Sequence, residues 1–284
     1  MADTYKKKES AAITPHKQVR KTFSMHFARF KNASKRLIDK LLFPDNLKCT
    51  FCGADIPNFD ERPYCDDCAK TLPYNNGHRC EICDQPIGSE ATVCDFCQKE
   101  KRNFKKAICP FLYEDEVKNA ILAFKDSNQR YRAKAFARMI AEKLEGLSID
   151  IITFIPMTDK KLKQRTFNQS QLLAEELGKI LQKPVLACFE KLRDVKSQKT
   201  LTYQQRRAAM VGTYQAKRVK LSKSQNILIV DDIITTCATV GYCAGLIYPR
   251  VNNIYVCGLA REYVRPAQTQ KGRKNILFSF KTKK

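Results

Sequence analysis

The sequence has no apolar run that approaches the ~20 residues of a membrane-spanning helix. Its basic N-terminus is not followed by the apolar segment of a signal peptide. We therefore expect a cytoplasmic protein without a transmembrane segment. In that reducing compartment the 13 cysteines are expected to be free thiols or metal ligands rather than disulfides.

Two further absences bear on the stretch ILIVDDIITTCAT, residues 227–239. The chain contains no GxxxxGK motif followed by Ser or Thr, which argues against a P-loop ATPase. Residues 240–284 contain no aspartate, so the phosphoacceptor that a response-regulator receiver domain needs downstream is missing. The acidic pair Asp231–Asp232 therefore belongs to another kind of site, or it caps a turn.

Positive charge dominates the chain, with a formal net charge of +23. Residues 1–48 carry a net +8 and residues 264–284 a net +7, so about two thirds of the excess lies at the two ends. Basic ends of this kind favour a polyanionic partner, above all nucleic acid. The alternative is that they only keep the chain soluble.

Eight cysteines form four CxxC pairs, and they are Cys49, Cys52, Cys65, Cys68, Cys80, Cys83, Cys94 and Cys97. Two thiolates three positions apart on a tight turn can reach one Zn²⁺, and two such turns complete a tetrahedral site. Four sulfur ligands leave no open position, so two structural zinc ions are expected. We favour sequential pairing of the turns, with interleaved pairing, iron–sulfur ligation and redox pairs as the alternatives.

Apolar patterns predict alternating strands and helices after this module, hence an α/β domain with a mostly parallel sheet. Strands are expected at 107–113, 149–156, 227–230 and 253–260, and helices at about 114–125, 131–145, 167–181 and after Thr239, which would cap the last one. Residues 191–210 read as a polar stretch without an element. The expected organisation is a basic extension with an amphipathic helix (1–43), a double zinc ribbon (44–103), the α/β domain (104–263) and a basic tail (264–284).

The stretch 227–239 combines a buried strand, two carboxylates, a loop of small residues and a helix N-terminus. Ligands of open α/β sheets bind at the carboxyl ends of strands, and a helix N-terminus attracts anions. The sequence therefore predicts an anion site with a hydroxyl or metal site beside it.

These residues also resemble a known family. ILIVDDIITTCAT resembles the phosphoribosyl pyrophosphate (PRPP) loop of type I phosphoribosyltransferases, and CxxC ribbons ahead of such a domain resemble the ComF family of ComFC/GntX-like competence proteins. IPMTDKKLKQRTFNQSQLLA (155–174) and KLRDVKSQKTLTYQQRRAAMVGTY (191–214) resemble two more segments of that family. The resemblance covers about residues 40–262 and implies a phosphoribosyltransferase-like sheet with helices on both faces.

The resemblance also implies roles for particular residues. Asp231 and Asp232 would accept hydrogen bonds from the ribose hydroxyls of PRPP and help to hold Mg²⁺. The 5′-phosphate would be surrounded by Thr235, Thr236, Cys237, Ala238 and Thr239. The candidates for the pyrophosphate are Lys125, Lys163 and Arg165.

The chain departs from the family pattern at three positions. Cys237 and Thr166 stand where glycine is usual, and Met210 where asparagine is usual. A Cβ at position 237 can crowd the phosphate or block a positive φ, so we expect weakened turnover of PRPP.

The function implied by the resemblance is the handling of single-stranded DNA in natural transformation, with a bound phosphoribosyl ligand. A DNA-uptake helicase or another transformation protein is the expected protein partner. The alternative is an active phosphoribosyltransferase that transfers ribose 5-phosphate from PRPP to a small acceptor. A scaffold that docks another uptake protein through its zinc ribbons is a third interpretation.

Overall fold

The computed structural model describes residues 48–56, 62–88, 90–126, 129–194 and 203–263. These residues belong to one compact unit that begins at Lys48. The helix expected within residues 21–43 and both basic ends lie outside the described residues. No helix in the described ranges is long and apolar enough to cross a bilayer.

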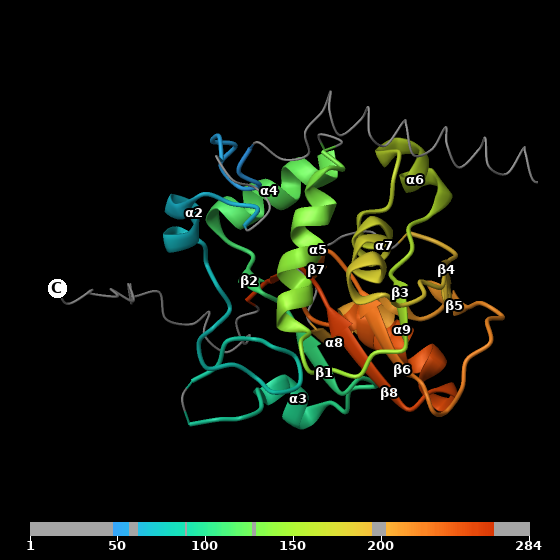
Figure 1. The fold of residues 1–284 in the computed structure, drawn as a ribbon. Helices are drawn as coiled ribbons and strands as arrows, with labels where there is room; N and C mark the ends of the chain where they lie inside the picture. Colours follow the sequence, from blue (N-terminus) through green and yellow to red (C-terminus); the bar gives the residue numbers. More distant parts are fainter. Residues whose placement is uncertain (1–47, 57–61, 89, 127–128, 195–202, 264–284) are drawn as a thin grey trace, which may run out of the picture. The chain divides into compact units, whose positions relative to one another are not determined.

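The central sheet has four parallel strands (Figure 1). They are β1 (Lys106–Ile108), β3 (Ile151–Phe154), β6 (Asn226–Val230) and β8 (Asn253–Cys257), in the order β1-β8-β6-β3. All four residues of β3 and the last four of β6 and β8 are buried, which explains their uninterrupted apolar sequences. The mostly parallel α/β class predicted from the sequence is confirmed.

Three of these strands break and then continue into a second parallel sheet. Its strands are β2 (Phe111–Leu112), β7 (Ile233–Ile234) and β9 (Ala260–Arg261), in the order β2-β9-β7. The continuous strands expected at 107–113 and 253–260 are therefore wrong. Pro110 cannot donate a ladder hydrogen bond, and a Cβ on Gly258 would come within 2.9 Å of Ile234, so each position interrupts its strand.

Helices cover both faces of the main sheet, as the sequence predicted. One face packs against α4 (Asp115–Asp126), α5 (Arg132–Lys143) and α7 (Gln169–Leu181), with Phe124 and Phe136 in the shared core. The other face packs against α9 (Ala238–Ile247). Each face also receives one cysteine group, Cys49 and Cys68 on the first and Cys80, Cys83, Cys94 and Cys97 on the second.

The remaining elements are short. They are α2 (Asp66–Thr71), α3 (Asp95–Lys99), α6 (Asp159–Arg165), α8 (Tyr203–Met210), the 3₁₀ turn η1 (Tyr248–Arg250) and the antiparallel pair β4 (Phe189–Lys191) and β5 (Tyr214–Ala216). The helix α8 lies within residues 191–210, where no element is expected from the sequence, because its polar composition hides the helical period.

The start of α9 also differs from expectation. The helix begins at Ala238 with Cys237 as its N-cap, so Thr239 lies inside the first turn and does not cap the helix. The Thr239 hydroxyl instead lies 3.7 Å from the sulfur of Met210, at the end of α8.

Candidate functional site

Asp231 and Asp232 lie at the break between β6 and β7, at the carboxyl edge of the main sheet. The Ser170 hydroxyl, from the start of α7, donates to Asp231 Oδ1 at 2.9 Å. Lys125, near the end of α4, places Nζ 2.9 Å from Asp232 Oδ2. The amide of Asp232 donates to Asp231 Oδ1 at 2.9 Å, so the two carboxylates share one network.

The segment that begins α7 is built around Asn168. Its Oδ1 accepts from the amides of Ser170 and Gln171 and so caps the helix, and its Nδ2 donates to the carbonyl of Ile155 at 2.9 Å. These hydrogen bonds of Asn168 hold the start of α7 in place and so fix Ser170 beside Asp231. Ser170 is a site residue that the sequence did not identify, although an asparagine directly before a helix indicates a fixed helix N-terminus.

Asp231 and its neighbour Lys125 both have shifted pKa values, for different reasons. Burial, together with the neighbouring charge of Asp232, raises the pKa of Asp231 to about 7, against the hydrogen bond from Ser170 and the charge of Lys125. Burial lowers the pKa of Lys125, but the charge and hydrogen bond of Asp232 outweigh it and leave that pKa raised. Asp231 is therefore a carboxyl near its titration point at neutral pH, beside a lysine that stays protonated.

This raised pKa predicts a pH-dependent stability. The unfolded-state pKa is about 3.9, so the folded state holds the proton of Asp231 more tightly and wild-type stability falls as the pH rises from about 4 to about 7. We expect Asp231→Asn to be more stable than wild type at pH 8, with an advantage about 1 kcal/mol larger than at pH 6. Urea unfolding at both pH values measures the difference. Glu175→Gln, at an exposed carboxyl of α7, controls for the lost charge. An advantage independent of pH would contradict the assignment.

The loop 235–239 leads directly into α9. The Thr236 hydroxyl accepts from the amide of Ala238 at 3.3 Å, and Cys237 adopts a left-handed conformation with φ of 61°. Thr166, the other residue at a usual glycine position, also has positive φ, at 65°. The side chains at these two positions therefore do not block the left-handed conformation. The first amides of a helix lack intrahelical partners, so the loop ends at an anion-attracting helix N-terminus.

The three pyrophosphate candidates lie in different places. Lys125 joins the carboxylate pair, as described above. Lys163 and Arg165 lie on α6, where Lys163 is exposed and Arg165 is half-buried. The structure thus brings one of the three to Asp232.

A second cationic group, not anticipated from the sequence, surrounds Asp194. Its carboxylate accepts from the Thr158 hydroxyl at 2.9 Å and lies 3.1 Å from Lys161 Nζ and 3.5 Å from Lys191 Nζ. Burial and the charge of Lys161 lower the pKa of Lys191, while the charges of Asp194 and Asp231 oppose the shift. Lys191 therefore lies within the electrostatic field of Asp231.

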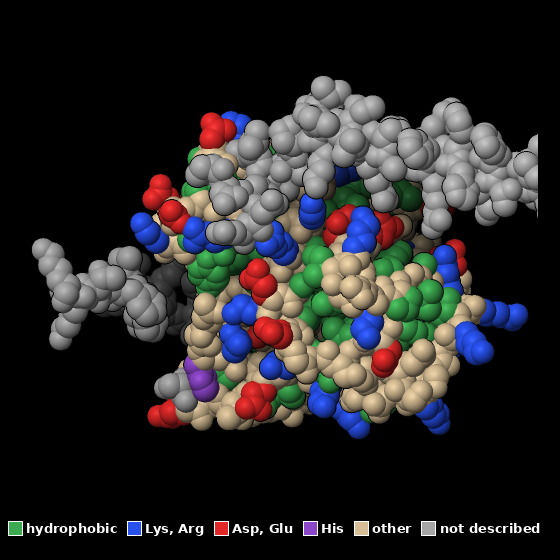
Figure 2. Space-filling view, in the orientation of Figure 1, with side chains coloured by type: hydrophobic (Ala, Val, Ile, Leu, Met, Phe, Trp, Pro, Cys, Tyr) green, Lys and Arg blue, Asp and Glu red, His purple; other side chains and the backbone are tan. Residues whose placement is uncertain are grey.

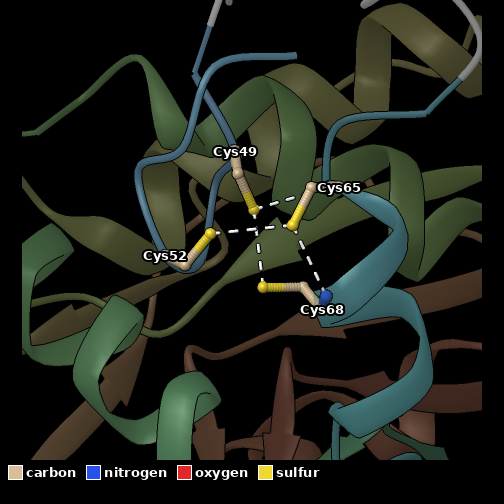
Figure 3. Close-up of side chains that lie close together, drawn as sticks. All are labelled: Cys49, Cys52, Cys65 and Cys68. Carbon is tan, nitrogen blue, oxygen red and sulfur yellow. Dashed lines mark hydrogen bonds between the residues drawn. The ribbon is translucent and has the colours of Figure 1, made fainter.

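The cysteines form two groups of four, with the sequential pairing that the sequence favoured. In the first group the sulfurs of Cys49 and Cys68 are 3.6 Å apart and those of Cys52 and Cys65 are 3.7 Å apart (Figure 3). A tetrahedral centre with Zn–S bonds of about 2.3 Å places its sulfurs about 3.8 Å apart. These two sulfur–sulfur distances are close to those of a tetrahedral zinc site, so the four thiols could hold a structural zinc ion.

The second group has the same form. Cys83 and Cys94 have sulfurs 3.6 Å apart, and all four residues of the group are buried. The residue after the second cysteine has positive φ in both groups, Gly53 at 77° and Asp84 at 60°, which confirms the tight turn expected there. The two groups can bind two structural zinc ions, and four sulfur donors at each leave no open position for catalysis.

Comparison with known proteins adds to this geometry. No family model matches the chain. The competence protein ComFC of Streptococcus pneumoniae is 26% identical over 212 residues, which cover 68% of this chain and 90% of that protein. ComFC of Bacillus subtilis is 24% identical over 189 residues, which cover 63% and 75%. The chain is a distant homologue of the ComFC competence proteins.

Among solved structures, an adenine phosphoribosyltransferase from Thermoanaerobacter pseudethanolicus matches with a TM-score of 0.32 and 18% identity, covering 48% of this chain and 83% of that one. The relation to ComFC therefore rests on the sequence matches.

Proposed function

We propose that this protein binds a PRPP-type phosphoribosyl ligand with Mg²⁺ at Asp231, Asp232 and the loop 235–239, and that it handles single-stranded DNA in natural transformation. The observation that carries the proposal is the carboxylate pair held by Ser170 and Lys125 beside the N-terminus of α9.

The chemistry of the site matches the parts of such a ligand. Ribose hydroxyls need acceptors, and Mg²⁺ prefers carboxylate oxygens, so both suit Asp231 and Asp232. A phosphate suits the amides at the start of α9. Lys125 already neutralises one carboxylate, so a bound cation would share Asp232 with it or displace it.

Support for the DNA part comes from the relatives and from charge. Both relatives are named competence proteins. About two thirds of the excess positive charge lies in residues 1–48 and 264–284. On the face shown in Figure 2 basic side chains alternate with acidic ones instead of forming one stripe. The charge of the two ends makes them candidates for contacts with the DNA backbone, with the phosphoribosyl site as a further contact.

Fluorescence anisotropy with single-stranded DNA across a salt series tests the proposal. We expect binding that weakens as salt rises, that PRPP–Mg²⁺ displaces, and that becomes weaker but persists in a chain shortened to residues 44–264. Asp231→Asn with Asp232→Asn should remove the displacement by PRPP–Mg²⁺ and leave the salt dependence. Binding lost with the ends and indifferent to PRPP would show that charge alone holds DNA. Absence of PRPP binding in calorimetry with Mg²⁺ would remove the ligand from the proposal.

One observation keeps turnover of PRPP as a second candidate function. Cys237 adopts the positive φ that glycine usually supplies, so the conformation of the loop survives the departure from the family pattern. Pyrophosphate release from PRPP, abolished by Asp231→Asn and Asp232→Asn, would distinguish this function from binding alone.

A further inference from the structure

Arg261, the last residue of β9, joins the second cysteine group to the loop 235–239. Its Nε donates to the carbonyl of Cys83 at 2.9 Å, and one Nη lies 3.8 Å from Cys83 Sγ. The other Nη donates to the carbonyls of Ile234, at 2.8 Å, and Thr235. One guanidinium therefore holds the second CxxC turn and the entry to the loop together.

In the part of the chain that the structure describes, the hydrogen bonds of Arg261 do not include one to a negatively charged group that could compensate its charge. The side chain is 2% exposed, and within the described ranges its acceptors are backbone carbonyls, Gln85 Oε1 and a cysteine sulfur, with no carboxylate among them. The nearby Asp84 is paired with Arg79 and accepts from the amide of Cys109. The charge of Arg261 acts on Asp84 at longer range, but a buried guanidinium with no directly bonded counter-charge is unfavourable.

The second cysteine group would supply that counter-charge. Four thiolates around one Zn²⁺ carry a net charge of about −2. Two arginines contact this group, Arg261 at Cys83 and Arg102, whose Nε lies 3.4 Å from Cys97 Sγ. The positive charge of Arg261 would therefore be compensated by a zinc-loaded centre.

Cys237 makes the second connection. Its side chain is 3% exposed and belongs to the same buried cluster as Cys80, Cys83, Cys94 and Cys97. Its backbone has positive φ, and its carbonyl accepts from the amide of Gly241 in the first turn of α9. The residue that strains the loop is thus the one whose side chain packs in the core of the second group.

The first cysteine group has no such connection among the described residues. It packs against the core of α4 and α5 through Phe51, and the arginine beside it, Arg132, donates to the carbonyl of Thr50. It therefore provides a matched control within the same chain.

We propose that the centre formed by Cys80, Cys83, Cys94 and Cys97 is the ionic partner of Arg261 when it holds zinc, and that Arg261 and Cys237 are positioning residues through which it fixes the loop 235–239. The effect of the metal centre on ligand binding rests on the proposed function, in which the loop 235–239 binds the phosphate of the ligand. The link between the metal centre and the loop conformation is independent of any ligand.

Hydrogen–deuterium exchange of the full chain, without ligand, tests the link. Cys80→Ser with Cys94→Ser removes the second zinc and leaves the two cysteines that the arginines contact; Cys52→Ser with Cys65→Ser removes the first. We expect the amides of residues 235–241 to exchange at least about tenfold faster in the first variant and within about twofold of wild type in the second. Equal exchange in the two variants would overturn the proposal. Amides of α7 report whether each variant remains folded.

A reciprocal measurement covers the case in which a serine variant does not fold. Coupling between two sites acts equally in both directions, so weakening Arg261 should loosen the second zinc. We expect Arg261→Lys to speed the transfer of one zinc ion to a chelator by at least about threefold, whereas Arg132→Lys leaves that ion unchanged. Unchanged zinc release in Arg261→Lys would overturn the proposal. If these couplings hold and PRPP still does not bind the wild-type protein, the proposed function alone fails.

Discussion

Replacing Cys49 and Cys68 with serine is expected to lower the zinc content from two ions to one and the melting temperature by at least about 10 °C. Structural zinc centres contribute about 10–16 kcal/mol of apparent binding free energy in isolated fingers, which exceeds the stability of many domains. The two cysteines are 2% and 5% exposed, within the core that contains Phe51. Without zinc the turn that carries Phe51 keeps its own backbone hydrogen bonds, from Cys49 to Ala54 and from Gly53 to Cys49, but loses the metal that joins it to the turn of Cys65 and Cys68.

The measurement is zinc content by atomic spectroscopy together with thermal unfolding. Cys188→Ser is the matched control, because Cys188 is equally buried and belongs to neither group. It is expected to keep both zinc ions and to lose about 1–3 kcal/mol for burying a hydroxyl. A double variant that retained two zinc ions would show that the first group is not a metal centre.

Arg261→Met is expected to lower the free energy of unfolding by about 3–5 kcal/mol. Arg261 is 2% exposed, and the substitution removes the arginine donor from the carbonyls of Cys83 and Glu262 and from the side-chain oxygen of Gln85. The Ile234 carbonyl loses one donor but still accepts from the amide of Glu262 at 2.9 Å. Each buried acceptor without a partner costs about 1–3 kcal/mol, although water can reach some of them once the side chain shortens.

Urea unfolding measures the loss, with Arg250→Met as the control. Arg250 is half-buried and donates to the carbonyl of Val219, so its replacement is expected to cost about 1 kcal/mol. If both variants lost the same free energy of unfolding, Arg261 would stabilise the fold no more than a half-buried arginine with one carbonyl partner. Its position between the metal centre and the loop would then make no extra contribution to stability.

The elements predicted from local pattern were those with a strong local signal. The helices at 131–145 and 167–181 and the strands at 149–156 and 227–230 correspond to α5, α7, β3 and β6. Periodicity fails where one residue interrupts a strand, as at Pro110 and Gly258, or where a helix is polar, as in α8. Only contacts with neighbouring strands decide those cases.

The site shows the same division. The sequence by itself determined the two cysteine groups, because CxxC spacing fixes two ligands on one turn, and it placed Asp231 and Asp232 at a strand end. It could not show that Ser170 and Lys125 reach those carboxylates, since both lie over 60 residues away in the chain. It identified Cys237 as a departure from the family pattern, and only the tertiary structure places that residue in the same buried cluster as Cys83. The spacing of two ligands on one turn is a local constraint that can be read directly from the sequence. The partner of a buried charge or thiol is decided by how distant segments pack.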